Sequence, residues 1–240
     1  MGDKKTKKVK KVTTTVEYID VPVNEKTHII CILDRSGSMS SIMDDSIGGF
    51  NTFLKQQKEL PDEATITVVL FDDKYELLYD NVDIKNANEL TSADWYPRGT
   101  TALYDAIGKT INSEKARFKK LGDEKPSKVL VCVVTDGYEN ASREFNINNI
   151  KSLISDCEKE DWNFIYLAAN QDAFDIGTSF GISGLNTFTY TADSLGVANM
   201  SSTLSDATTT YRSISTTDSD FKLRSKSLVK DKKDSDKSTE

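Results

Sequence analysis

The chain has 240 residues, 37% of them hydrophobic and 29% charged, which suits one soluble domain with a sizeable core and polar ends. The formal net charge is −7; residues 1–16 sum to +5 and residues 217–240 to +1, which leaves −13 for the body between them. This acidic body argues against nucleic acid as the main partner, because phosphate contacts need clustered Lys and Arg.

Apolar runs alternate with helical patterns along the chain. Short apolar or β-branched runs predict strands at 27–33, 65–71, 75–79, 128–134, 164–169 and 186–190. Apolar residues at helical spacing predict helices at 42–59, 101–119, 147–160, 173–180 and 195–214. The Gly48-Gly49 pair lowers helix propensity inside the first of these helices, so we expect it to mark close packing on the sheet.

Strands that alternate with helices predict an α/β fold with a doubly wound, mostly parallel central sheet flanked by helices. The strands at 65–71 and 75–79 are separated only by a short turn, which predicts one antiparallel edge hairpin strand. We expect a basic flexible tail at 1–16, the folded domain at 17–215 and a disordered charged tail at 216–240, because the two end segments offer little apolar surface to bury.

The sequence contains no run of 18 apolar residues and no cleavable leader pattern, so we expect no membrane span and no secretion. Cys31, Cys132 and Cys157 lack the paired spacing of disulfide or metal sites. They predict buried or incidental thiols in a reducing compartment.

The segment Asp34-Arg35-Ser36-Gly37-Ser38 directly follows the apolar run at 27–33. It places one carboxylate and two hydroxyls on a tight loop at the end of a buried strand, and Gly37 allows the loop to bend back. Oxygen ligands at this spacing suit a hard divalent cation, above all Mg²⁺.

Two further polar loops complete the pattern. Thr135-Asp136-Gly137 follows the strand at 128–134, and Arg98-Gly99-Thr100-Thr101 opens a helix. Ligands of doubly wound sheets bind at the carboxyl ends of strands, so the three loops predict one site. Taken singly, each loop also has a simpler interpretation as a helix cap or a turn.

The three motifs Asp34-x-Ser36-x-Ser38, Gly99-x-Thr101 and Thr135-Asp136-Gly137 resemble the metal-ion-dependent adhesion site of von Willebrand factor A (VWA) domains. The resemblance covers about residues 27–212. Segments such as DRSGSMSSIMDDSIGGFN and RGTTALYDAIG are similar to a bacterial and bacteriophage branch of intracellular A-domain proteins. The resemblance implies a Rossmann-like VWA fold and a cytoplasmic location in a bacterium or a phage-infected host cell.

The resemblance also implies a role for each site residue. Ser36 and Ser38 would bind the metal through their hydroxyls, and Thr101 would bind it directly or through water. Asp34 and Asp136 would act mainly through water. The implied cofactor is Mg²⁺, with Mn²⁺ or Ca²⁺ as alternatives.

Two further implications concern the ligand set and the partner. Gly99-Thr100-Thr101 offers two hydroxyls, so Thr100 competes with Thr101 as the ligand. A cation with few direct carboxylates remains electrophilic, which implies a protein partner that presents Asp or Glu. The family's usual mechanism would let the last helix, 195–214, slide when the partner binds.

The sequence predicts a binding module and not an enzyme. A phosphatase of the aspartyl-nucleophile type needs a second Asp where Ser36 stands, and neither a Gly-x-Ser-x-Gly elbow nor a phosphate-cradling Gly-x-x-x-x-Gly-Lys run is present. The only histidine, His28, begins the first strand, and we expect it to be structural or exposed. The alternative function is a structural or assembly component of a phage virion or a multi-subunit machine, with an incidental metal site.

Aromatic and basic residues flank the three loops. The aromatic residues are Trp95, Tyr96, Tyr104 and Tyr138. They would either rim the metal as anchors for a partner or pack at the edge of the core. Arg35 and Arg98 would either attract an acidic partner segment or pair with the acidic surface.

Overall fold

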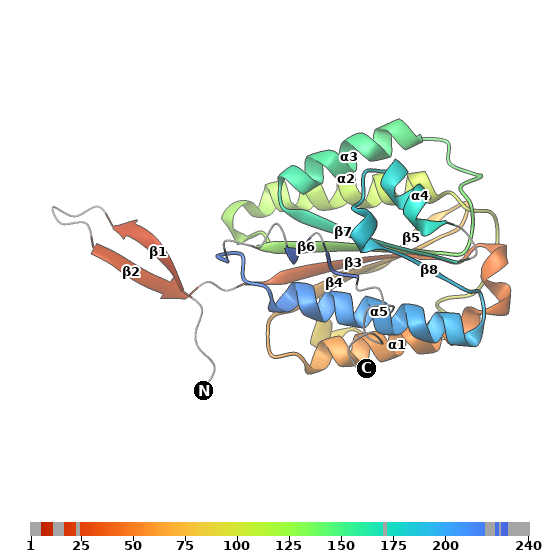
Figure 1. Cartoon of the computed structure of the whole chain (residues 1–240), viewed down its shortest axis with the longest axis horizontal. Helices are drawn as coiled ribbons and strands as arrows, with labels where there is room; N and C mark the ends of the chain where they lie inside the picture. Colours follow the sequence, from red (N-terminus) through yellow and green to blue (C-terminus); the bar gives the residue numbers. More distant parts are fainter. Residues whose placement is uncertain are drawn as a thin grey trace, which may run out of the picture.

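The computed structural model describes residues 6–11, 17–22, 25–169, 172–218, 224–225 and 227–229. A six-stranded sheet in the order β5-β4-β3-β6-β7-β8 lies between two layers of helices (Figure 1). Its strands are β3 (Thr27–Asp34), β4 (Ala64–Phe71), β5 (Tyr75–Asp83), β6 (Lys128–Thr135), β7 (Trp162–Ala169) and β8 (Thr187–Tyr190). The α-helices are α1 (Met43–Glu59), α2 (Leu103–Leu121), α3 (Ile147–Lys159), α4 (Ala173–Ser179) and α5 (Ser194–Ser213).

The strand directions confirm the predicted fold class. β3 pairs in parallel with both β4 and β6, and β7 continues the parallel sheet towards β8. Only the edge strand β5 runs antiparallel to its neighbour in this sheet. The chain leaves β3 towards β4 on one side and later reaches β6 on the other side, so the winding changes direction between β3 and β6. Such a switch point leaves a crevice at the carboxyl ends of the two strands.

Both faces of the sheet are covered by helices. Alternate residues of β3 enter the two halves of the core: Ile29, Cys31 and Leu33 pack on the side of α1 and α5, and Ile30 and Ile32 on the side of α2 and α3. Figure 1 shows α1 and α5 below the sheet and α2, α3 and α4 above it. Burial on both faces explains why the central strands are apolar along their whole length.

The glycine pair in α1 has a different role from the one expected. A Cβ on Gly49 would collide with the side-chain hydroxyl of Ser201 in α5, whereas a Cβ on Gly48 would meet only open space. The close packing is therefore between α1 and α5, and the expectation that the pair packs on the sheet is wrong. The hydrophobic pattern identified the helix but could not identify which element covers it.

Both predicted tails contain described segments. In the N-terminal part, β1 (Thr6–Lys11) and β2 (Glu17–Pro22) form a separate antiparallel pair. In the C-terminal part, Leu228 and Val229 are buried, and the Val229 N–H donates to the carbonyl of Leu185. At these positions the structure differs from the predicted tails, because the apolar pair Leu228-Val229 finds a covered place beside β8. The rest of both tails lies outside the described residues, and the domain boundaries stay a prediction.

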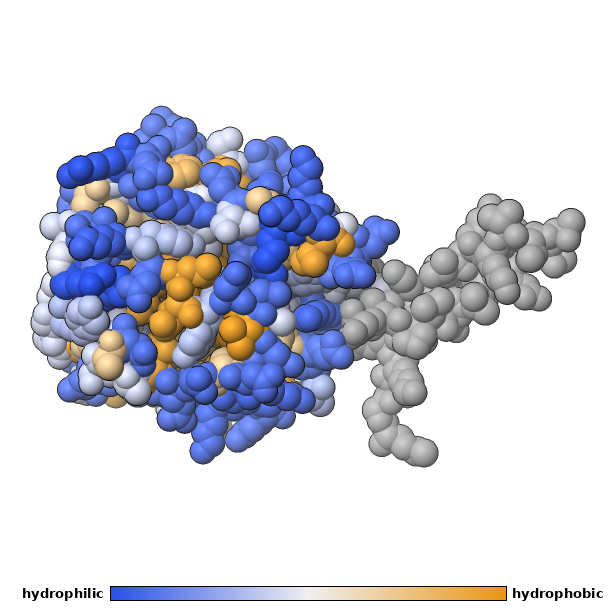
Figure 2. Space-filling view, turned by 180° about the vertical axis from the view of Figure 1, so that it is seen from behind, coloured by the Kyte–Doolittle hydropathy of each residue, from blue (hydrophilic) through white to orange (hydrophobic). Residues whose placement is uncertain are grey.

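The surface of the described body is mostly polar. Figure 2 shows one face that is largely hydrophilic, with a few small apolar areas. Within the described residues, no helix is long and apolar enough to cross a membrane. Cys31, Cys132 and Cys157 are all buried and unbonded to one another, as predicted.

Candidate metal site

Asp34 ends β3 and is fully buried at the switch point of the sheet. One of its carboxylate oxygens accepts a hydrogen bond from the Ser36 N–H at 2.6 Å, and the other accepts from the Thr135 hydroxyl at 2.5 Å. The carboxylate therefore ties the loop after β3 to the loop after β6. Since both oxygens already have a donor, Asp34 is suited to orienting a coordination shell.

Hydroxyl groups from the loop after β3 meet a carboxylate from the loop after β6. The Ser36 and Ser38 side-chain oxygens lie 3.0 Å apart, and the Ser38 hydroxyl donates to Asp136 at 2.6 Å. Because the Ser38 hydroxyl is the donor in its hydrogen bond to Asp136, the lone pairs of its oxygen remain available to a cation. Four of the five predicted site residues are thus brought together by direct contacts.

The fifth residue, Thr101, lies beside Gly137, on the same side as Ser38. A Cβ on Gly137 would lie 2.8 Å from the Thr101 hydroxyl oxygen and 3.4 Å from that of Ser38, so both hydroxyls face the space above this glycine. Thr101 is buried, whereas Thr100 is exposed and lines a neighbouring groove. The structure therefore turns Thr101 towards the other site residues and Thr100 away from them.

Backbone contacts hold the loops at this separation. The Gly37 N–H donates to the carbonyl of Gly99, and the Arg98 N–H donates to the carbonyl of Arg35. Trp95 is buried, and its indole N–H donates to the carbonyl of Asp34 at 3.0 Å. Trp95 thus belongs to the support of the site and not to its rim.

The other three aromatic residues differ in exposure. Tyr96 and Tyr138 are 42% and 63% exposed and remain available to a partner. Tyr104 is half-buried and its ring packs edge-on against Phe180. Tyr96 and Tyr138 therefore fit the interpretation as exposed anchors, whereas Trp95 and Tyr104 fit the interpretation as residues packed at the edge of the core.

The two arginines pair within the chain. Arg35 is fully buried and its guanidinium lies 2.7 Å from the carboxylate of Glu76, while Arg98 lies 2.5 Å from that of Asp72. Both arginines thus pair with acidic residues of the chain, of which Glu76 lies at the surface and Asp72 is buried. These pairs also fasten the loops that carry the site residues to β5 and to the turn before it.

The only histidine lies far from these loops in the fold. His28 is fully buried near the amino end of β3, where its ring lies 2.7 Å from the hydroxyl of Thr65. Burial lowers the pKa of His28, against the opposing influence of Glu114. The structural interpretation of His28 is confirmed.

Sequence reasoning missed two carboxylates that shape the loop after Asp136. Glu139 accepts hydrogen bonds from the backbone N–H groups of Tyr104 and Ser142, and from the Ser142 hydroxyl. Asp105 accepts from three consecutive backbone N–H groups in the same loop. The local spacing of Glu139 and Ser142 is typical of a turn, but nothing in the sequence indicates the long-range bonds to α2.

The electrostatics of the site favour a cation. Burial raises the pKa of Asp34 to about 6, and the charge of Asp136 adds to the rise, while hydrogen bonds from Thr135 and Ser36 oppose it. Burial also raises the pKa of Asp136. A bound divalent cation would stabilise both carboxylates in their charged forms.

The donor set fits a hard cation that keeps part of its water shell. No three His, Cys, Asp or Glu residues gather into a metal site in the part of the chain that the structure describes. The cluster offers instead three hydroxyls and two carboxylates, which are the oxygen donors that Mg²⁺ accepts alongside water. Gly137 leaves the hydroxyls of Thr101 and Ser38 uncovered, since any larger residue would fill the space between them.

No protein-family profile matches the chain, and no curated protein matches its sequence. Solved structures do match its fold. A von Willebrand factor type A structure from Catenulispora acidiphila has a TM-score of 0.54 at 15% identity, over 80% of this chain and 44% of that one. Manganese-loaded TRAP protein from Plasmodium vivax has a TM-score of 0.54 at 15% identity, over 74% of this chain and 72% of that one.

A third match is proximal thread matrix protein 1 from the mussel byssus, in a structure described as having a zinc-occupied MIDAS motif. Its TM-score is 0.50 at 19% identity, over 74% of this chain. The matched region spans only 44% of that mussel protein. The strand order, the helical layers and these neighbours lead to one conclusion: this chain has the Rossmann-like fold of von Willebrand factor A domains.

Proposed function

We propose that this protein is a VWA-type module that binds Mg²⁺ at Asp34, Ser36, Ser38, Thr101 and Asp136 and uses it to capture an acidic side chain of a partner protein. The observation that carries the proposal is the convergence of three loops, which bring the hydroxyls of Ser36, Ser38 and Thr101 beside the buried carboxylate of Asp34 and the half-buried carboxylate of Asp136. When bound, the cation supplies an electrophilic position that a carboxylate of the partner can occupy.

The chain's own residues prepare that position. Asp34 fixes the Ser36 backbone and the Thr135 hydroxyl, so the first and third loops keep their separation without a ligand. The Ser38 hydroxyl donates its hydrogen bond to Asp136, so the lone pairs of its oxygen are available to the cation. The exposed rings of Tyr96 and Tyr138 are suited to contacting apolar groups next to the captured acid.

We propose a binding role without catalysis. His28 is held in the core at the other end of β3, and its ring is engaged by threonine hydroxyls. The polar groups at the proposed site are hydroxyls and carboxylates that contact one another; Ser38 donates to the Asp136 carboxylate, but no histidine joins that pair as a general base. The buried free thiols favour a reducing compartment, and we propose the cytoplasm of a bacterium or a phage-infected host cell.

The experiment measures binding of an acetylated, amidated Ala-Ala-Asp-Ala-Ala peptide by NMR shift titration of the full chain, in Mg²⁺ and in EDTA. The same peptide with Asn in place of Asp is the ligand control. We expect binding of the Asp peptide in Mg²⁺, and its loss in EDTA, with the Asn peptide and in Ser38→Ala. Binding that survives EDTA and Ser38→Ala would overturn the proposal.

Two controls separate loss of the site from loss of the fold. Ser41→Ala removes an exposed hydroxyl on the same loop and should bind the Asp peptide as the wild type does. Circular dichroism of Ser38→Ala should match that of the wild type, because Ser38 is exposed. Mn²⁺ and Ca²⁺ are then compared with Mg²⁺ in the same titration to identify the preferred metal.

A further inference from the structure

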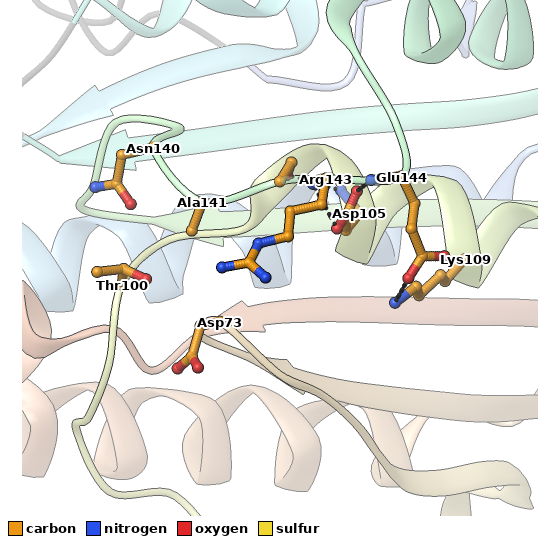
Figure 3. Close-up of a pocket in the computed structure, with 9 residues that line it drawn as sticks. Asp73, Thr100, Asp105, Lys109, Asn140, Ala141, Arg143 and Glu144 are labelled. Atoms are coloured by element: carbon orange, nitrogen blue, oxygen red, sulfur yellow. Dashed lines mark hydrogen bonds and ion pairs between the residues drawn. The ribbon is translucent and has the colours of Figure 1, made fainter.

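A polar groove of about 550 Å³ adjoins the proposed metal site (Figure 3). It lies between the start of α2, the loop after Asp136 and the turn between β4 and β5. Thr100 lines it directly beside the site residue Thr101. Its lining residues are Asp73, Thr100, Asp105, Lys109, Asn140, Ala141, Ser142, Arg143 and Glu144.

Most charges in this groove are already used within the chain. Asp105 accepts hydrogen bonds from the backbone N–H groups of Arg143, Glu144 and Phe145, at 2.8–2.9 Å. Lys109 lies 2.7 Å from the carboxylate of Glu144. These contacts leave Arg143 and Asp73 as the charged side chains that can respond to a ligand.

Arg143 is built to face the groove. Figure 3 shows its guanidinium extending into the space between Thr100 and Asp73. Within the described part of the chain, no carboxylate lies within ion-pair distance of this guanidinium. The backbone beneath it is held by hydrogen bonds to Asp105 and Glu139, so the point from which the side chain extends is set before any ligand arrives.

One neutral donor accompanies the guanidinium. The Thr100 hydroxyl is exposed at the groove wall. Asn140 also lines the groove, but its carbonyl oxygen accepts the Thr101 N–H and its amide nitrogen points away from Arg143 (Figure 3). An arginine beside a hydroxyl donor is suited to recognising a carboxylate.

We infer that this groove is a second subsite, which binds a second carboxylate from the partner segment whose first carboxylate binds the metal. This inference rests on the proposed function, because the metal-bound acid positions the segment. Thr100 and Thr101 are consecutive, so the groove begins next to the proposed metal site, within reach of a segment whose first acid is bound there. The partner is thus an acidic peptide segment with two nearby Asp or Glu residues.

Asp73 opposes this ligand from the facing wall. Its carboxylate lies against the backbone of Gly99, which has a positive φ of 67° and no room for a side chain on that side. A second carboxylate in the groove would be attracted by Arg143 and repelled by Asp73. Removing the two charges one at a time should therefore change its affinity in opposite directions.

The experiment uses the full chain saturated with Mg²⁺ and the Asp peptide described above as the one-acid probe. Two-acid probes carry a second Asp one, two or three residues after the first, and Asn at the same place provides matched controls. We expect at least one spacing to bind about tenfold tighter than its Asn control, which is the gain of one charge-assisted hydrogen bond. Arg143→Gln should remove that gain, and Asp73→Asn should enlarge it.

Lys119→Gln is the charge-matched control, since it also removes one positive charge but lies exposed near the end of α2. It should leave the gain of the second acid unchanged. Equal affinity of one-acid and two-acid peptides at every spacing, or a gain that survives Arg143→Gln, would overturn the second subsite alone. A one-acid peptide that ignores Mg²⁺ would overturn the proposed function and the inference together.

Discussion

The two ends of the central sheet both bury charged groups, but they treat them differently. At the amino end, the Lys128 ammonium donates to the carbonyls of Arg212 and Ile214 at 2.6 and 3.0 Å and lies 3.7 Å from the carboxylate of Glu25. At the carboxyl end, Asp34 and Asp136 contact hydroxyl and N–H groups, and no cation of the described chain pairs with either. The buried Arg35 and Asp72 at the carboxyl end are paired within the chain, so the contrast between the two ends concerns Glu25 on one side and Asp34 and Asp136 on the other.

The pKa directions follow this contrast. Burial alone would raise the pKa of Glu25, but hydrogen bonds from Ser215 and Thr216 and the charge of Lys128 hold it below its usual value. Burial prevails for Asp34, whose pKa is raised to about 6. A carboxylate cluster that lacks a cation of its own is suited to bind one from outside. The amino end is thus a structural clamp on α5, and the carboxyl end is a binding site.

The largest expected effect comes from breaking the clamp. Lys128→Met leaves Glu25 buried without its cation and removes two hydrogen bonds at the end of α5, so we expect a loss of about 3–5 kcal/mol in the free energy of unfolding. Urea unfolding measures it. Lys115→Met breaks a partly exposed pair with Glu160 and should cost less than about 1 kcal/mol. Equal costs for the two variants would contradict the clamp.

Removing the charge of Asp34 at the carboxyl end should raise the free energy of unfolding, the opposite of the effect of Lys128→Met. In EDTA at pH 7.5, Asp34→Asn avoids burying an unpaired charge, and its amide can still accept from Ser36 and donate to Thr135. We expect the metal-free protein to gain about 1–3 kcal/mol in the free energy of unfolding. Glu25→Gln, the matched change in the clamp, should lose stability. Destabilisation by both substitutions would remove the contrast between the two ends.

The gain from Asp34→Asn should depend on pH. The pKa of Asp34 is about 6 in the folded protein and 3.8 in its ordinary state, so the folded chain binds more protons between these values. Wild-type stability relative to the variant therefore rises as pH falls from about 6 to about 4, and the difference of about 1–3 kcal/mol present above pH 6 shrinks towards zero. Urea unfolding of both proteins across this range, in EDTA, measures the difference. If the difference in the free energy of unfolding did not change with pH, the effect of Asp34→Asn would come from packing and not from the charge of Asp34.

The smallest effect distinguishes the two adjacent threonines. Thr101→Val should weaken Mg²⁺ binding by about tenfold or more, because its hydroxyl faces the site. Thr100→Val should leave Mg²⁺ affinity unchanged, since Thr100 lines the neighbouring groove. Calorimetric titration with Mg²⁺ compares the two variants directly. The reverse order of affinities would make Thr100 the ligand.

The sequence predicted the fold class and all six strands of the main sheet, because a sheet covered on both faces demands long apolar runs such as the one that became β6, but it predicted neither β1 nor β2. It also placed four of the five candidate site residues at or just after strand ends and Thr101 at the start of a helix, and the topology brings these loops together. Whether they bind metal stays a prediction.

The remaining features depend on contacts between distant parts of the chain. The Trp95 indole donates to the loop that begins at Asp34. Lys128 donates to the carbonyls of Arg212 and Ile214, which lie 84 and 86 positions later in the chain. The sequence left Trp95 open between the rim of the site and the edge of the core, and it marked Lys128 only as the first residue of a strand. Neither periodicity nor local spacing can indicate such pairings, since they arise only when the sheet is assembled.

The most direct test is the change in the free energy of unfolding of the full chain between EDTA and saturating Mg²⁺ at pH 7.5. If the carboxyl end binds a cation only when folded, Mg²⁺ at a hundredfold excess over its dissociation constant should stabilise the wild type by about 2.7 kcal/mol. Asp34→Asn should lose most of this stabilisation, and Lys128→Met should retain it. A wild type whose free energy of unfolding is the same in Mg²⁺ and in EDTA would contradict the account.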